Sequence, residues 1–233
     1  MVEVVGKSID QKIESDKENL DTLCEQNEFV LFDNSALSRH VNSKSQEKND
    51  VELQLKWTYW LGEKVRNSSV IYIPTKVLKE YHSGIKRSSI HQDIKDGMRL
   101  FMNVVEEKKR VLSIQDVKGY DAQFRSLKPL KKVCGLSETD YQLLVMGAVL
   151  SESFATSIVT NDTGIIDAFS FVQGRFLGVS MWSRLYDFNN DLKKVDNTIL
   201  KLIKRRNGGL SAELEKRKAL DDAGFVYNYY RRV

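Results

Sequence analysis

Four short, continuous apolar runs constrain the fold of this chain more than any other feature. They lie at 29–32 (FVLF), 70–74 (VIYIP), 111–114 (VLSI) and 157–160 (SIVT). A short apolar run without polar alternation is typical of a strand that is buried on both faces. Helical spacing of apolar residues appears between and around these runs, at 8–26, 50–66, 75–81, 89–109 and 138–150. Short buried strands that alternate with helices predict an α/β fold with a mainly parallel sheet.

The composition excludes several classes of protein. Of 233 residues, 41% are hydrophobic and 29% charged, close to globular averages, so a sizeable core can be buried. Two cysteines, Cys24 and Cys134, cannot build a disulfide framework, and three histidines leave little for a histidine-based metal site. No apolar run approaches the ~18 residues of a membrane span, and the first residues lack a signal-peptide core. We therefore expect a cytoplasmic protein with no membrane partner.

Charge is distributed unevenly along the chain, although the net charge is only +4. Residues 1–28 hold three lysines against eight acidic residues, whereas residues 191–233 hold 11 basic against six acidic residues. The sequence predicts an acidic, helical N-terminal extension at 1–28, a domain at 29–186 and a basic, helical C-terminal extension at 187–233. Three alternatives stay open: the two ends contact each other, the basic end binds a polyanion, or both are solvated helices.

Carboxylates follow the predicted strands at positions that parallel strands bring together. Asp33 ends the first strand and Asp162 follows the fourth. Glu80 lies on the second turn of the helix after the second strand, and Asp140 in the first turn of a helix capped by Ser137. Ligands of such sheets bind beyond the carboxyl ends of the strands, so we expect these acids to converge. Four carboxylates repel one another unless a hard cation lies between them, and oxygen ligands alone favour Mg²⁺ or Mn²⁺.

Each acid taken singly also fits an ordinary role, as a strand-end turn residue, a helix-dipole residue or a solvated helix residue. Their joint occurrence in this order favours a metal site. His82 lies two positions after Glu80 and points away from it on a helix, so we expect His82 and likewise His91 at the surface. Cys134 is expected to be a small buried apolar residue.

Four segments resemble the motifs of the PIN-domain nuclease family, in order and in spacing. They are FVLFDNSAL, VIYIPTKVLKEY, LSETDYQLLVMGAVL and SIVTNDTGI, and the resemblance covers about 29–182. The resemblance implies a three-layer α/β/α sandwich with a mainly parallel central sheet. It also implies divalent-metal-dependent hydrolysis of phosphodiester bonds, usually of RNA, with 5′ phosphates on the products. A short helix at 165–172 and a last strand at 175–182 complete the expected domain.

By this resemblance, four acids are catalytic and bind Mg²⁺ or Mn²⁺: Asp33, Glu80, Asp140 and Asp162. Ser35, Thr160 and Asn161 would be secondary polar groups of the site. An additional contact of Asp167 to the metal through water is an open alternative. One or two bound ions would lower the pKa of a water molecule, align it with phosphorus and stabilise the leaving 3′ oxygen.

The expected function is therefore that of a metal-dependent endoribonuclease of RNA processing or turnover, acting mainly on single-stranded RNA. Basic residues expected to contact nucleic acid are Lys86, Arg87, Lys204, Arg205 and Arg206. Alternatives are a toxin ribonuclease with an antitoxin partner, a non-catalytic subunit that binds RNA or protein, and a structure-specific DNA nuclease. A protein partner, such as an RNA-processing complex, and a homodimer through the aromatic stretch 55–61 also stay open.

Overall fold

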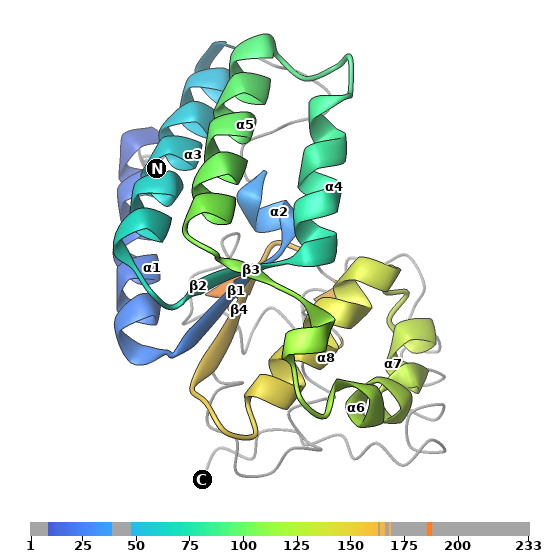
Figure 1. Ribbon diagram of the computed structural model, residues 1–233. Coiled ribbons are helices and arrows are strands. Elements are labelled where there is room, and N and C mark those ends of the chain that lie inside the picture. The colour runs from blue at the N-terminus through green and yellow to red at the C-terminus, as the bar shows by residue number, and fades with distance from the viewer. Residues whose placement is uncertain (1–8, 39–47, 163, 166–167, 169–185, 188–233) are drawn as a thin grey trace, which may run out of the picture.

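The computed structural model describes residues 9–38, 48–162, 164–165, 168 and 186–187 (Figure 1). Its centre is a sheet of five strands in the order β3-β2-β1-β4-β5, in which every neighbouring pair is parallel. The strands are β1 (Phe29–Phe32), β2 (Ile71–Pro74), β3 (Val111–Leu112), β4 (Thr156–Thr160) and β5 (Tyr186–Asp187). The prediction of an α/β fold with a parallel sheet is confirmed.

Helices cover both faces of this sheet (Figure 1). One face is covered by α1 (Ile9–Gln26), α3 (Lys48–Asn67), α4 (Thr75–Ile85) and α5 (Gln92–Glu107). The other is covered by α6 (Tyr120–Ser126), α7 (Lys128–Val133) and α8 (Glu138–Leu150). Along β1, Val30 and Phe32 join the first core and Leu31 the second, because successive side chains of a strand point to opposite faces.

Several predicted boundaries differ from those in the structure, and two of the differences change the type of element. The third strand ends at Leu112 because Ser113 caps a 3₁₀ helix, η1 (Ile114–Asp116), in a reciprocal capping box with Asp116. Asp187 was predicted to begin a helix, but it pairs with Thr160 as part of β5. The strand predicted at 175–182 and most of the helix predicted at 165–172 lie outside the described residues.

The acidic segment at the start of the chain forms the predicted helix, α1, and its inner edge joins the core. Leu20 is fully buried and Leu23 nearly so, both in the cluster that includes Val30 of β1. On the outer side, Asp21 forms an ion pair with Lys64 of α3 at 2.5 Å. The last turns of α1 therefore pack as part of the domain.

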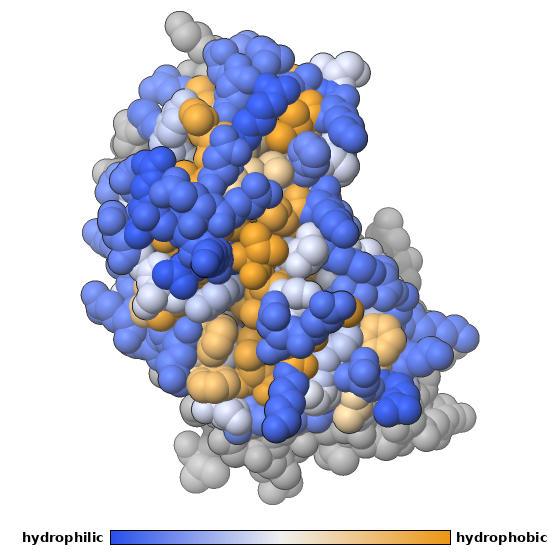
Figure 2. Space-filling model, viewed as in Figure 1, coloured by the Kyte–Doolittle hydropathy of each residue, from blue (hydrophilic) through white to orange (hydrophobic). Residues whose placement is uncertain are grey.

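The stretch 55–61, considered above as a dimer surface, is partly core. Trp57 and Leu61 are buried, whereas Tyr59 is 53% exposed and lines a shallow groove between α3 and α5 with the exposed Leu100. The face in Figure 2 is mostly hydrophilic, with hydrophobic atoms visible in seams between the elements. Within the described part of the chain, no helix has the length and apolar character needed to cross a membrane.

The strand order reverses between β1 and β4. From β1 the chain proceeds outward to β2 and β3, and then returns to add β4 on the opposite side of β1. A crevice forms at the carboxyl ends of the strands where the order reverses, and ligands of open α/β sheets bind there. The functional site is therefore expected next to Asp33 and the end of β4.

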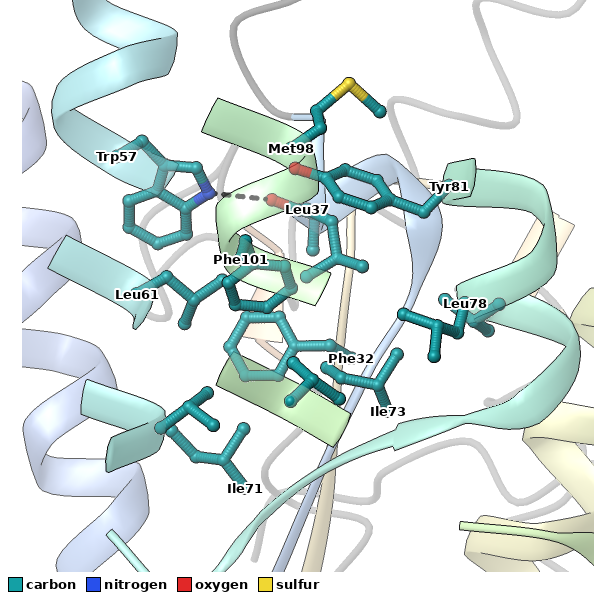
Figure 3. Close-up of a cluster of buried hydrophobic side chains, with 14 of the residues drawn as sticks. Phe32, Leu37, Trp57, Leu61, Ile71, Ile73, Leu78, Tyr81, Met98 and Phe101 are labelled. Carbon is teal, nitrogen blue, oxygen red and sulfur yellow. Dashed lines mark hydrogen bonds between the residues drawn. The ribbon is translucent and has the colours of Figure 1, made fainter. Parts of the chain in front are cut away.

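A single turn of helix, α2 (Asn34–Leu37), follows β1 at this point and is held by α3. The indole Nε1 of Trp57 donates to the carbonyl of Ala36 at 3.0 Å (Figure 3), and Gln54 Nε2 donates to the carbonyl of Leu37 at 3.0 Å. These two bonds satisfy carbonyls that a helix of four residues leaves without partners. They fix α2, and with it the carboxylate of Asp33 at its N-cap.

We expect Trp57→Phe to lower the free energy of unfolding by about 1–3 kcal/mol, because it leaves the buried Ala36 carbonyl without its donor. The matched control is Trp60→Phe, which removes the same atoms from a half-buried indole that stacks on Trp57. Chemical denaturation of both variants checks this. Equal losses of stability would contradict the assigned role of the Trp57 hydrogen bond.

Candidate functional site

Asp33 is the most buried acid at the reversal point, with only 2% of its surface exposed. Its carboxylate caps α2, since Oδ1 accepts a hydrogen bond from Asn34 N at 2.6 Å and Oδ2 one from Ser35 N at 3.2 Å. Oδ2 also accepts from the hydroxyl of Ser35 and, at 2.9 Å, from that of Thr160. The buried carboxylate is therefore held by donors from both α2 and β4.

The two hydroxyl groups that bind Asp33 also fix the segment after β4. Ser35 Oγ accepts from Asn161 N at 2.8 Å, and Thr160 Oγ1 accepts from Asp162 N at 2.9 Å. A further bond joins Asn161 Nδ2 to the Ser35 carbonyl at 3.2 Å. The structure thus brings together five of the residues that the sequence singled out, from two segments about 125 positions apart.

Asp162 is half-buried and caps the next helical turn. Its Oδ1 accepts from Gly164 N at 2.6 Å and from Ile165 N at 3.1 Å. A Cβ atom on residue 164 would lie 2.9 Å from that same Oδ1, which is closer than real Cβ contacts. Glycine at 164 therefore leaves room for the Asp162 carboxylate in this orientation.

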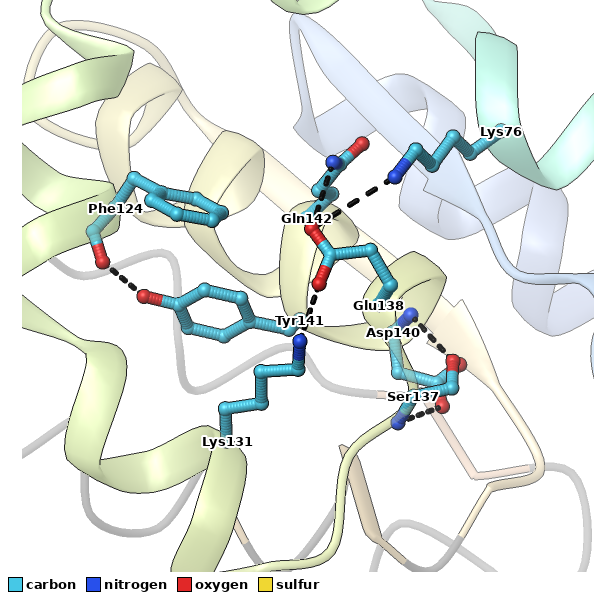
Figure 4. A network of polar contacts seen from close by, with 8 residues as sticks. All are labelled: Lys76, Phe124, Lys131, Ser137, Glu138, Asp140, Tyr141 and Gln142. Atoms are coloured by element: carbon cyan, nitrogen blue, oxygen red, sulfur yellow. Dashed lines mark hydrogen bonds and ion pairs between the residues drawn. The ribbon is translucent and has the colours of Figure 1, made fainter.

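Asp140 lies in the first turn of α8, as predicted, and Ser137 is the N-cap (Figure 4). Ser137 Oγ accepts from Asp140 N at 3.1 Å, while Asp140 Oδ2 accepts from Ser137 N at 3.1 Å. The Asp140 charge is close enough to Asp33 to raise its pKa. Glu80 lies on the second turn of α4 and is half-buried, and its carboxylate has no hydrogen bond or ion pair with any described residue.

Burial raises the pKa of Asp33 to about 6. The hydrogen bonds from Ser35 and Thr160 oppose this shift, and the negative charge of Asp140 adds to it. A carboxylate that is costly to ionise in isolation is stabilised by a nearby cation. The electrostatics of the site therefore favour a positively charged ligand.

Two amide oxygens near Asp33 are buried and have no hydrogen-bond partner in the described part of the chain, Asn34 Oδ1 and Asn161 Oδ1. Together with the carboxylates they give an all-oxygen set, which suits Mg²⁺ or Mn²⁺. The residues present thus fit a hard cation by their chemistry. Among the described residues, however, no three His, Cys, Asp or Glu side chains are grouped closely enough to hold a metal ion.

Asn34 was not singled out from the sequence, although it stands between two residues that were. The sequence could have indicated Asn34, because it directly follows the aspartate that ends the first strand. Its side-chain oxygen can therefore be a metal ligand at the same edge of the sheet. Lys76 and Lys79 were also missed. With Thr75, Ser113, Thr139 and Gln142, they line a pocket of about 160 Å³ at the carboxyl ends of β2 and β3.

The other predicted residues lie away from this cluster or outside the described chain. Lys86 and Arg87 are exposed at the far end of α4, whose 11 residues separate them from the sheet by about 16 Å. His82 and His91 are exposed and Cys134 is buried, as predicted. Positions outside the described residues are Asp167, Lys204, Arg205 and Arg206.

No protein-family model, curated protein or solved structure matches this chain. The function is therefore inferred from the sequence motifs and from the geometry of the site.

The raised pKa of Asp33 predicts how stability depends on pH without metal. The folded state holds this proton more tightly than the unfolded chain, whose pKa is near 3.8, so stability falls as pH rises through about 6. Between about pH 5 and about pH 7.5, Asp33 lowers the free energy of unfolding by about 1 kcal/mol.

Chemical denaturation in EDTA should show this loss of stability, and Asp33→Asn should reduce it. Asp96→Asn, at an exposed position of α5, is the control and should leave the loss unchanged. Identical pH dependence in the wild type and Asp33→Asn would contradict the assignment.

Proposed function

We propose that this protein is a Mg²⁺- or Mn²⁺-dependent ribonuclease with a PIN-like fold. One observation carries the proposal: the buried Asp33 carboxylate is joined to the Thr160-Asn161-Asp162 segment at the point where the strand order reverses. Open α/β sheets bind their ligands at this point. The parallel sheet with helices on both faces supports the three-layer α/β/α architecture that the motifs imply.

Four acids would hold the cation: Asp33, Glu80, Asp140 and Asp162. Three of them have a carboxylate oxygen that accepts no hydrogen bond from a described residue, whereas both oxygens of Asp33 accept at least one. Asp140 and Asp162 use one carboxylate oxygen in capping and accept no hydrogen bond from a described residue on the other, and the Glu80 carboxylate is unpaired within the described chain. When bound, the cation supplies a water molecule of lowered pKa and stabilises charge on the leaving oxygen.

The other roles in the proposed reaction are assigned to polar side chains around Asp33. Ser35 and Thr160 donate to Asp33 Oδ2 and so keep that carboxylate ionised and aligned against the cost of burial. The carbonyl oxygens of the Asn34 and Asn161 side chains are buried and lack partners among the described residues, so each can accept a hydrogen bond from a buried water molecule. No side chain needs to act as a nucleophile.

The proposal predicts that cleavage of single-stranded RNA requires both a divalent metal and the acid cluster. Asp33→Asn and Asp162→Asn should lower the cleavage rate in Mn²⁺ by at least about 100-fold, because they remove charged ligands. Asp96→Asn, an equal change on the exposed face of α5, should retain wild-type rates. EDTA should abolish cleavage in every sample, and parallel assays on duplex RNA and flap DNA define the substrate.

Cleavage that survives Asp33→Asn would overturn the assigned site. RNA binding without cleavage in any divalent metal would instead indicate the non-catalytic subunit considered above.

Metal binding has a readout that does not depend on activity. A cation that binds the ionised acids stabilises the folded state, by about 2.7 kcal/mol at 100 times its Kd. We expect Mn²⁺ to raise Tm at about pH 7.5 and much less at about pH 5, where protons compete for Asp33. The increase should be absent in Asp33→Asn and retained in Asp96→Asn. An equal increase in wild type and Asp33→Asn would show that Mn²⁺ binds elsewhere.

A further inference from the structure

The pocket between α4 and α8 has a mixed wall, in which polar side chains that the proposed chemistry does not use lie beside Pro74, Leu112, Ile114 and Met146. Its volume of about 160 Å³ is far above the ~10–15 Å³ that holds one water molecule, so a tetrahedral phosphate fits. Its polar lining consists of Thr75, Lys76, Lys79, Ser113, Thr139 and Gln142. Hydroxyl, amide and ammonium groups of this kind donate hydrogen bonds, which suits an anion.

Two lysines, Lys76 and Lys79, line the pocket, and they differ in their ion pairs. Lys76 Nζ lies 3.7 Å from Glu138 Oε1, and the same carboxylate accepts hydrogen bonds from Lys131 and, at 3.1 Å, from Gln142 (Figure 4). The hydrogen bond from Lys131 lowers the pKa of Glu138, which therefore stays ionised. Its single negative charge is shared by two ammonium groups, while Lys79 has no ion pair with any described residue.

Thr139 gives a second and independent indication of a ligand. Its side chain lines the pocket, only 6% of the residue is exposed, and its hydroxyl has no hydrogen-bond partner among the described residues. A hydroxyl that lines the pocket without a partner in the described part of the chain is free to donate a hydrogen bond to a ligand oxygen.

The pocket adjoins the acid cluster along the chain. Lys79 directly precedes Glu80 on α4, and Thr139 directly precedes Asp140 on α8. We infer that this pocket binds a backbone phosphate of the single-stranded RNA substrate, next to the scissile phosphate. The identity of the polymer rests on the proposed function, whereas the phosphate chemistry rests on the pocket itself.

Binding of a short fluorescein-labelled single-stranded RNA in EDTA tests this without cleavage. Lys79→Gln, an exposed position, should raise Kd several-fold and reduce the slope of log Kd against log salt by about 0.7, the value for one phosphate contact on a single strand. The matched control is Lys108→Gln, the same charge change at the exposed end of α5, which should leave Kd and slope unchanged. Inorganic phosphate alone should shift the NMR amide signals of Thr75 and Thr139 in wild type and less in Lys79→Gln.

Equal effects of Lys79→Gln and Lys108→Gln, or no effect of either, would overturn the inference. Phosphate binding with an unchanged RNA Kd in Lys79→Gln would also overturn it, because the pocket would then serve free phosphate. The two proposals fail separately. If Lys79→Gln reduces the salt dependence of RNA binding but the wild type shows no metal-dependent cleavage, the pocket is retained and the ribonuclease proposal is refuted. If the wild type cleaves RNA with metal but Lys79→Gln leaves the salt dependence unchanged, only the pocket is refuted.

Discussion

The burial of one carboxylate organises the edge of the sheet at the carboxyl ends of its strands. Asp33 is 2% exposed, and a carboxylate in that environment needs several donors to stay in place. They come from the backbone of α2 and from the hydroxyls of Ser35 and Thr160, so β1, α2 and β4 must meet at one point. The same hydroxyls accept hydrogen bonds from the backbone N–H groups of Asn161 and Asp162. These bonds fix the position of Asp162 relative to Asp33.

This arrangement depends in turn on α3. A helix of four residues has no stability of its own, and the donors of Trp57 and Gln54 hold its last carbonyls. The burial of Trp57 therefore has a structural reason. Glu138 of α8 contacts two other helices, through Lys76 of α4 and Lys131 of α7. The surroundings of Asp33 and the pocket lined by Lys76 and Lys79 are thus each held by specific polar contacts.

Much of the fold could be predicted because its signals are local. FVLF, VIYIP and SIVT are short and apolar, as is typical of buried strands, and Ser137 is a cap that can be read from the few residues around it. The end of β3 was missed because Ser113 and Asp116 form a capping box that stops an otherwise apolar run. The β5 pairing was missed because Tyr186–Asp187 has no strand signal of its own and is a strand only through its bonds to β4.

The sequence by itself determined which residues could form the site, since the strand-end positions of Asp33, Thr160 and Asp162 follow from patterns a few residues long. Only the tertiary structure decided which of them share hydrogen bonds, that burial raises the pKa of Asp33, and that the side-chain oxygens of Asn34 and Asn161 lack partners among the described residues. It alone revealed the pocket of Lys76, Lys79 and Thr139, whose walls come from three separate segments, at 74–79, 112–114 and 139–146. The physical reason is that the desolvation of a polar group and its hydrogen bonds depend on the groups that pack against it. Those neighbours are decided by how the strands pair and how the helices pack on the sheet.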